Sequence, residues 1–454
     1  MNSLPKALLS SLEHLPGFDA GTFCEVHASG VRITSVRVNP ARYFNVKDHF
    51  PGAEQVPWCS TGYYLPERPS FTLDPLFHAG AYYVQEAGSM FLEQALRQTA
   101  DLSRQLRVLD LCASPGGKST LIQSLISPDS LLVSNEVIKT RVGTLTENIT
   151  KWGAINAIVT NNDAKDFQRI PSFFDVIVVD APCSGSGLFR KDNDAITEWS
   201  PNNVALCSQR QQRILADIIP ALKAGGTLIY STCSYSEKEN EEIADLLSAD
   251  HQMQTVRLFR EGFTGITETQ SKKDHCYGYR FYPDKIKSEG FFIAAFRKPG
   301  DESIPPAKKI KGTEISSKER QMILPYLSAQ NDLGFIKQQE DILALPKELL
   351  NDLWELQQSL YIKKAGIKIG TLIREALIPA HGLAMSGIMS GIFPGVELSL
   401  PAALDYLRKK DIVIDEKTKG WALVKYCGNN LGFIKILPGR INNYYPGELR
   451  ILNR

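Results

Sequence analysis

Residues 107–120 read RVLDLCASPGGKST, and this stretch decides the fold of the chain. The mostly apolar run 108–111 is typical of a buried strand, and the proline and two glycines at 115–117 then predict a tight turn. An apolar-periodic segment follows and predicts a helix over 118–127. A strand, a glycine turn and a helix together direct backbone N–H groups toward a ligand at the helix N-terminus.

The residues around this turn narrow the class of ligand. A P-loop is excluded because Cys112 occupies the position of its first glycine, and no G-x-G-x-x-G fingerprint is present. Glu136 follows the second predicted strand, twenty residues after Gly116, where a carboxylate can accept ribose hydroxyls. Asp163 follows the third strand, within reach of an adenine amino group. The set favours a nucleoside such as S-adenosylmethionine over a triphosphate.

Strand and helix patterns alternate from residue 106 to about 298. The predicted strands are 107–111, 131–135, 156–160, 175–180 and 226–231, and the predicted helices are 118–127, 138–152, 204–222 and 237–249. This alternation predicts an α/β fold with a mainly parallel sheet covered on both faces. Residues 255–258 and 291–296 are expected to close one sheet edge as a late pair.

The flanking regions have different patterns. Residues 31–38 alternate like a half-buried strand, and the apolar spacing of 80–95 suits a helix face. The segment 299–312 is rich in proline, glycine and charge and predicts a linker. Residues 313–454 are expected to form a separate unit, helical around 318–326 and 347–360 and strand-like over 420–452, with a hairpin turn at 428–430.

Composition bounds the class of protein. Hydrophobic residues make up 43% and charged residues 22% of the 454, which is typical of a globular protein of two or three domains. There is no apolar run of membrane-spanning length and no signal-peptide pattern, so we expect a cytoplasmic monomer without a membrane partner. Eight cysteines without a C-x-x-C pair favour neither a metal site nor a disulfide framework. Residues 408–454 hold ten Lys/Arg against four Asp/Glu, a basic end that suits a solvated surface or nucleic acid.

Two cysteines follow neighbouring predicted strands. Asp180 and Cys183 lie in DAPCSGSG at the end of strand 175–180, and Cys233 lies in STCS after strand 226–231. The carboxyl ends of parallel strands line one crevice, so both thiols are expected at the same mouth. A single cysteine would be read as a small buried hydrophobe, but two at equivalent strand ends indicate chemistry.

Carbon-5 of cytosine is a target that would use such a pair. This carbon is a poor nucleophile until a thiolate adds to carbon-6 of the ring. Asp180 can hold the exocyclic amine or the protonated ring nitrogen, and the second thiol can assist proton removal or elimination. A cation near the nucleophile would keep it ionised, and Lys191 is a candidate. Spacing alone does not rank the two cysteines.

Several long motifs resemble the RNA 5-methylcytosine methyltransferases of the NOL1/NOP2/Sun family. They are DLCASPGGKST, DAPCSGSG, STCSYSEKENEE, GYRFYPDKIKSEGFFIA and GAYYVQEAGSM, within residues 25–298. HGLAMS at 381–386 and KGWALVKY…LGFIK…NNYYPGELR resemble the C-terminal region of bacterial RsmF-type members. The resemblance implies a Rossmann-like class I methyltransferase fold, an N-terminal RNA-binding extension over 1–98, a catalytic domain over 99–298 and a PUA-like domain over 313–454.

The resemblance also implies a role for each matching position. S-adenosylmethionine would be contacted by Cys112, Ala113, Ser114, Pro115, Gly116, Gly117, Lys118, Glu136, Asp163 and Asp180. Cys233 would be the nucleophile, Cys183 would assist product release, and Asp180 would also act in catalysis. Small-subunit ribosomal RNA is the expected substrate; a transfer RNA, or RNA binding without catalysis, are the alternatives.

Two positions depart from the family pattern. Asp284 stands where many members carry histidine, and Ser288 where glycine is usual, and both departures bear on substrate docking.

The basic C-terminal end also carries aromatic residues. Some of them are expected to stack on RNA bases and others to build a core. These are Tyr426, Phe433, Tyr444 and Tyr445.

Overall fold

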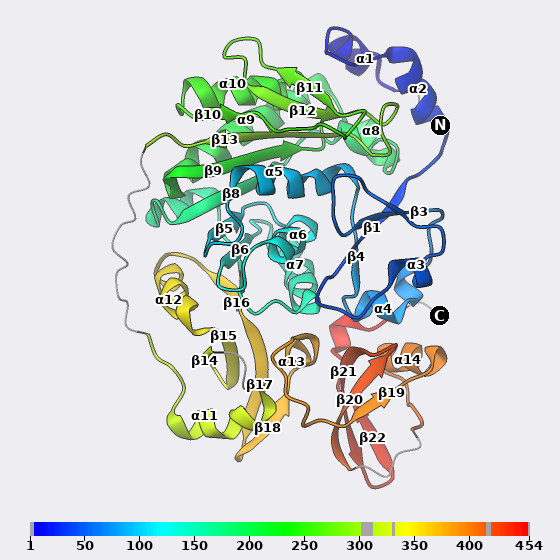
Figure 1. Cartoon of the computed structure of the whole chain (residues 1–454), viewed down its shortest axis with the longest axis vertical. Helices are drawn as coiled ribbons and strands as arrows, with labels where there is room; N and C mark the ends of the chain where they lie inside the picture. The colour runs from blue at the N-terminus through cyan, green and yellow to red at the C-terminus, as the bar shows by residue number, and fades with distance from the viewer. Residues whose placement is uncertain (1–3, 301–311, 329–331, 415–418, 453–454) are drawn as a thin grey trace.

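A ten-stranded sheet forms the centre of the computed structural model, which describes residues 4–300, 312–328, 332–414 and 419–452 (Figure 1). Its strands are β5 (Arg107–Asp110), β6 (Leu131–Asn135), β7 (Ala157–Thr160), β8 (Phe174–Asp180), β9 (Leu222–Thr232), β10 (Gln254–Val256), β11 (Thr267–Gln270), β12 (Tyr277–Phe281), β13 (Phe291–Arg297) and β16 (Ile362–Ala365). Their order is β11-β12-β13-β9-β8-β5-β6-β7-β16, with β10 paired to β13. Strands β7, β6, β5, β8 and β9 are parallel, and β13 runs antiparallel to β9.

This order confirms the predicted α/β fold. Each of the five expected parallel strands is present within a few residues of its predicted bounds, and β10 pairs with β13 as the late pair was expected to do. The order reverses between β5 and β8, and a ligand crevice is expected beside such a switch point, outside the carboxyl ends of the strands. The helices of this region are α6 (Gly117–Leu125), α7 (Lys139–Trp152), α8 (Asn193–Glu198), α9 (Pro201–Ile218) and α10 (Glu241–Ala249). Buried apolar side chains form one large cluster on each face of the sheet.

The N-terminal region adds a small antiparallel sheet of order β2-β3-β1-β4. Its elements are α1 (Lys6–Leu12), α2 (Ala20–Ala28), β1 (Thr34–Val38), α3 (Val46–His49), β2 (Glu54–Gln55), β3 (Gly62–Leu65), α4 (Pro75–His78), β4 (Tyr82–Val84) and α5 (Leu92–Thr99). The helix predicted over 80–95 is wrong in its first half, because residues 82–84 pair with β1 and the α-helix begins only at Leu92.

The C-terminal region holds two further four-stranded sheets, drawn in the lower half of Figure 1. One has the order β14 (Leu333–Gln338), β15 (Asp341–Pro346), β17 (Ile367–Ile373), β18 (Ala376–Pro379). The other has the order β19 (Gly395–Glu397), β20 (Gly420–Tyr426), β21 (Asn429–Leu437), β22 (Arg440–Asn443). The helices are α11 (Ser317–Ile323), α12 (Leu350–Ser359), α13 (His381–Met385) and α14 (Leu400–Leu407). The hairpin expected at 428–430 joins β20 to β21.

One strand of this region belongs to the central sheet. β16 pairs with β7, and apolar residues of 336–365 share a cluster with the sheet. The bidentate pair of Arg107 and Asp352, with an Nε–Oδ2 distance of 3.1 Å, adds a polar tie between β5 and α12. The C-terminal region is thus built onto the central sheet. The predicted linker lies mostly at 301–311, outside the described residues.

A buried ion pair supports the sheet where β11 and β12 pair. Arg280 on β12 and Glu241 at the start of α10 are almost fully buried, and the Arg280 Nε donates to Glu241 Oε1 at 2.7 Å. The Arg280 guanidinium also donates to the carbonyl of Tyr235 at 2.7 Å, and Thr269 Oγ1 donates to Glu241 at 2.8 Å. The pair therefore ties α10 and the loop after β9 to the sheet.

Replacing Arg280 with methionine is expected to lower the free energy of unfolding by about 3–5 kcal/mol, because Glu241 would be left as an unpaired buried charge. The free energy is measured by urea titration. Arg257→Met, at the exposed pair with Glu268, is the matched control and is expected to cost less than about 1 kcal/mol. An equal loss of unfolding free energy in the two variants would show that burial does not strengthen the contribution of the Arg280–Glu241 pair to stability.

Candidate active site

The glycine turn after β5 begins the site. Gly116 has a φ of 114°, which only glycine adopts without strain, and it is the N-cap of α6. Asn148 Nδ2 donates to the carbonyl of Pro115 at 2.8 Å, and the Ser114 carbonyl accepts from the Arg141 guanidinium at 2.7 Å. Helix α7 thereby holds the turn in place, so that the first N–H groups of α6 remain at the carboxyl edge of the sheet.

Lys118 and Asp180 form an ion pair across this edge. The Lys118 Nζ lies 2.7 Å from Asp180 Oδ2, and Ser231 Oγ donates to Asp180 Oδ1 at 2.8 Å. Burial works against the charged ammonium, but the negative charge of Asp180, with smaller contributions from Asp110 and Cys233, raises the pKa of Lys118 above its usual value. The sequence indicated Lys118 only as a cofactor contact. The structure also makes it the partner of Asp180.

The two strand-end cysteines meet as expected. The sulfurs of Cys183 and Cys233 are 3.0 Å apart, and both residues are half-buried free thiols. The hydrogen bond to Cys233 and burial raise the pKa of Cys183 well above its usual value. Lys118 is a cation whose charge interacts with Cys233, whereas Lys191 is exposed.

The acids after the second and third parallel strands line the same edge. Glu136 is buried, and its Oε1 accepts from the Ile138 N–H at 2.8 Å. Asp163 is one-third exposed and caps the short turn that follows it. Val137 and Ile138, directly after Glu136, are about half exposed, an apolar surface on which a flat ring can pack.

Tyr361, a residue of the C-terminal region, bonds to the loop after β7 at this edge of the sheet. The Tyr361 N–H donates to Asn162 Oδ1 at 2.9 Å, and the Tyr361 carbonyl accepts from the Asn161 N–H at 3.1 Å. Asn161 in turn donates its side-chain amide to the carbonyl of Glu136 at 2.6 Å. Tyr361 therefore holds the short loop after β7, which precedes Asp163 and bonds to Glu136, although it lies almost 200 residues further along the chain.

The remaining predicted contacts fall on the strand-to-turn segment. Cys112 and Ala113 follow β5 directly, and the Ala113 N–H donates to the carbonyl of Asn135 at 2.8 Å. Gly117 is the first residue of α6. All ten predicted cofactor positions thus lie after β5 to β8, at one edge of the sheet. Their roles remain predictions.

The motif 80–90 and the position of Ser288 are explained by packing. Glu86 accepts hydrogen bonds from the N–H groups of Gly88 and Ser89 at 2.8 Å, from Ser288 Oγ at 3.0 Å and from the Glu289 N–H at 3.0 Å. Ser288 therefore makes a bond that a glycine could not make. Asp284 accepts from Thr22 Oγ1 at 2.9 Å, so this departure anchors α2 beside the site.

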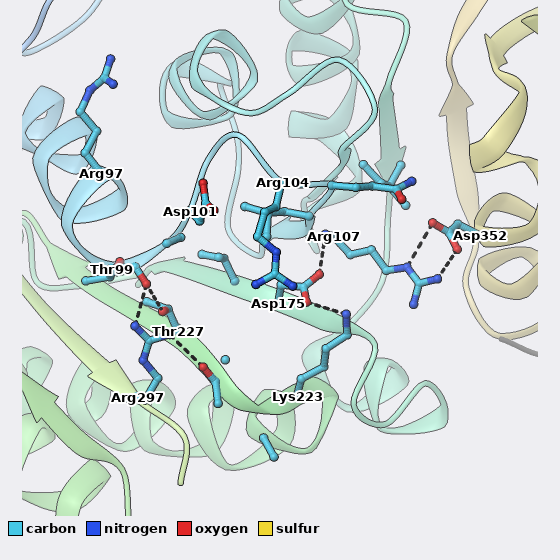
Figure 2. A pocket seen from close by; sticks show the side chains of 18 of the residues that line it. Arg97, Thr99, Asp101, Arg104, Arg107, Asp175, Lys223, Thr227, Arg297 and Asp352 are labelled. Carbon is cyan, nitrogen blue, oxygen red and sulfur yellow. Dashed lines mark hydrogen bonds and ion pairs between the residues drawn. The ribbon is translucent and has the colours of Figure 1, made fainter. Parts of the chain in front are cut away.

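A cavity of about 930 Å³ lies at the opposite edge, where the parallel strands begin (Figure 2). Figure 2 shows Lys223 turned toward Asp175 and Arg107 turned toward Asp352, whereas Arg97 points away from these pairs. Lys223 pairs with Asp175 at 2.5 Å, and Arg107 pairs with Asp352. This cavity does not adjoin the strand-end cysteines. Within the described residues there is also no group of three or more His, Cys, Asp or Glu that could hold a metal ion, and no helix long and apolar enough to span a membrane.

The sheet order, the glycine turn and the acids at the strand ends define the class of Rossmann-like methyltransferases. A family model described as 16S rRNA methyltransferase RsmB/F matches residues 98–297. Models of the N-terminal domain of 16S rRNA methyltransferase RsmF and of the methyltransferase RsmF PUA domain match residues 4–87 and 393–451.

Relatives match almost the whole chain. Ribosomal RNA small subunit methyltransferase F of Aeromonas salmonicida is 31% identical over 87% of this chain and 85% of its own length. The Vibrio vulnificus protein of the same name is 29% identical over 98% and 95%. A solved methyltransferase homologue from Pyrococcus horikoshii has 27% identity and a TM-score of 0.51, over 65% of this chain and all of its own. The chain therefore belongs to the RsmF family of methyltransferases.

A buried carboxyl beneath the site gives a pH-dependent prediction. Asp110 is fully buried, its Oδ2 accepts from Ser119 Oγ at 2.6 Å, and its Oδ1 has no partner among the described residues. Burial raises the pKa of Asp110 to about 7. Between about pH 4 and pH 7 the folded protein holds a proton that the unfolded chain has lost, so the contribution of Asp110 to stability falls as the pH rises.

Asp110→Asn removes this titration. Relative to the original protein, the variant is expected to gain roughly 2–3 kcal/mol between pH 5 and pH 8, since one pKa unit corresponds to about 1.4 kcal/mol. Urea unfolding at the two pH values measures the difference. The exposed Asp129→Asn serves as control and should show no such trend. A pH-independent difference for Asp110→Asn would contradict the raised pKa.

Proposed function

We propose that this protein transfers a methyl group from S-adenosylmethionine to carbon-5 of a cytosine in RNA, and that the RNA is small-subunit ribosomal RNA. The observation that carries the proposal is the pair of thiols 3.0 Å apart beside the Lys118–Asp180 ion pair. The names of the relatives supply the ribosomal substrate.

The residues at the carboxyl edge fit S-adenosylmethionine. The N-terminus of α6, the buried Glu136, the one-third exposed Asp163 and the exposed apolar pair 137–138 match the amino-acid, ribose and adenine parts of that molecule. A solved structure from Pyrococcus horikoshii, described as NSun6 with SFG, shares the fold at 19% identity and a TM-score of 0.54. When bound, S-adenosylmethionine supplies an electrophilic methyl group.

The residues of this chain would prepare the cytosine. Addition of the Cys233 thiolate to carbon-6 makes carbon-5 electron-rich. Asp180, about one-third exposed, can hold the exocyclic amine or the protonated ring nitrogen. After methylation the carbon-5 proton must leave to a base and the bond between sulfur and carbon-6 must break; Cys183, whose sulfur is 3.0 Å from that of Cys233, is proposed to assist this release. The family resemblance, and not the geometry, assigns the nucleophile to Cys233.

An RNA substrate must present an unstacked base to this crevice. In the C-terminal region, Tyr444 is 37% exposed, lies 4.4 Å from Trp421 between ring centroids, and is available for stacking. Phe433 and Tyr445 are buried and belong to the core, as was expected of some of these aromatics. We assign RNA binding to the N-terminal extension 1–98 and to residues 313–454, and catalysis to 99–298.

Cys233→Ala is expected to abolish methyl transfer, because carbon-5 would no longer be activated. Transfer of tritiated methyl groups to 16S ribosomal RNA measures the loss, and bisulfite sequencing of the RNA modified by the original protein tests for 5-methylcytosine. Cys207→Ala, a buried cysteine outside the pair, is the control and should keep most activity. Full activity of Cys233→Ala would exclude Cys233 as nucleophile, and methylation at another atom would exclude carbon-5 chemistry.

Cys183→Ala is expected to accumulate a covalent protein–RNA complex, because the addition step would remain while release is slowed. A denaturing gel with substrate RNA and S-adenosylmethionine shows the complex as a shifted band. The double variant Cys183→Ala/Cys233→Ala should lack this band. If Cys183→Ala alone shows no band and turns over normally, Cys183 has no role in release.

A further inference from the structure

One buried carboxylate joins the two loops that carry the thiols. Glu239 closes the short turn Glu237–Glu239 after β9, and its side chain is fully buried. Its Oε1 accepts from the Ser184 N–H at 2.8 Å, and its Oε2 accepts from Ser184 Oγ and from Ser234 Oγ, both at 2.6 Å. Each serine directly follows one of the two cysteines, so Glu239 fixes both loops at once.

Further bonds hold the carboxylate itself. Gln211 Nε2 donates to Glu239 Oε1 at 3.3 Å, and Tyr230 Oη donates to the Glu239 carbonyl at 2.7 Å. The four donors to the carboxylate are two hydroxyls, one backbone N–H and one amide, all of them neutral. Through Ser184 and Ser234 the carboxylate thus bonds to both cysteine loops, without a cationic donor among the described residues.

The charged and titratable groups around the pair are arranged unequally. Cys183 faces Cys233, Glu239 and Tyr230, whereas Lys118 acts on Cys233. The charge of Glu239 adds to the effects that raise the pKa of Cys183. The carboxylate that bonds to both loops therefore opposes ionisation of Cys183.

We propose that Glu239 is a positioning residue that clamps the two cysteine loops and makes the two thiols chemically unequal, so that Cys183 does not compete with Cys233 for the substrate. The clamp is supported by the set of hydrogen bonds alone. Only the catalytic purpose of the difference between the two thiols rests on the proposed function. A neutral thiol at Cys183 can hold and pass on a proton without competing for carbon-6.

Alkylation by iodoacetamide tests the inequality directly, because the thiolate is the form that reacts. Initial rates at Cys183 and Cys233 are measured over pH 6–10 by peptide mass spectrometry with limiting reagent on the full chain. In the original protein Cys183, whose thiol pKa is raised, is expected to react more slowly than Cys233.

Glu239→Gln keeps an oxygen acceptor for the Ser184 N–H and an amide that can bond to the serine hydroxyls, but it removes the charge. Cys183 is expected to react about three- to tenfold faster at pH 7.5 in this variant, with its pH profile moved to lower pH. Glu93→Gln, a change of another buried glutamate outside the cysteine loops, should leave the ratio of the two rates within about twofold. An unchanged ratio in folded Glu239→Gln overturns the proposal.

Ser234→Ala provides the second test and applies even if Glu239→Gln does not fold. It cuts the bond to the Cys233 loop and leaves the charge, so the Cys233 rate should rise about threefold while the pH profile of Cys183 stays in place. No change in the Cys233 rate would overturn the clamp. These readouts need neither RNA nor cofactor, so a protein without methyl transfer but with the expected alkylation pattern would refute the proposed function and leave the clamp standing.

Discussion

The ion pair between Lys118 and Asp180 depends on the strand arrangement and in turn defines the site. Lys118 stands in the first turn of the helix after β5, and Asp180 ends β8, so the pair spans the two strands between which the sheet order reverses. Ser231 on β9 adds a third strand to the same cluster. Because a buried ammonium is costly without a partner, the turn at Gly116 and the register of β5, β8 and β9 must be maintained together. The two cysteine loops follow directly after β8 and β9, so the register of these strands sets the positions of both loops.

Much of the central sheet could be predicted from the sequence because its strands are buried on both faces and read as continuous apolar runs. The error at 80–95 has a local cause. Its apolar spacing fits a helix face, but Tyr82 to Val84 pair with β1, which no local pattern reveals. The strand β16 was missed for a similar reason, since Ile362 pairs with Thr160 about 200 residues earlier. Partners so distant in the chain leave no local periodicity.

The candidate site, too, could be predicted from the sequence only in part. Strand-end position was enough to predict that Cys183 and Cys233 meet, because parallel strands end at one edge. It was not enough to show that Lys118 pairs with Asp180, which depends on side-chain direction. Glu239 lies in the motif STCSYSEKENEE, but nothing in that stretch of sequence shows that its side chain is buried; only the fold shows this. The resemblance to a known family ranked the cysteines, which neither spacing nor geometry does.

The placement of β16 within the central sheet has a mechanical consequence. Together with the Arg107–Asp352 pair, it joins the C-terminal region to the central sheet whose strand ends carry the two thiols, and Tyr361 joins this region to the loop after β7, beside Glu136 and Asp163. Groups of the C-terminal region that contact RNA would then lie at a set separation from the strand-end crevice. On the proposed function, an RNA that contacts both must match this separation, so its three-dimensional shape would contribute to substrate selection as well as the identity of one base.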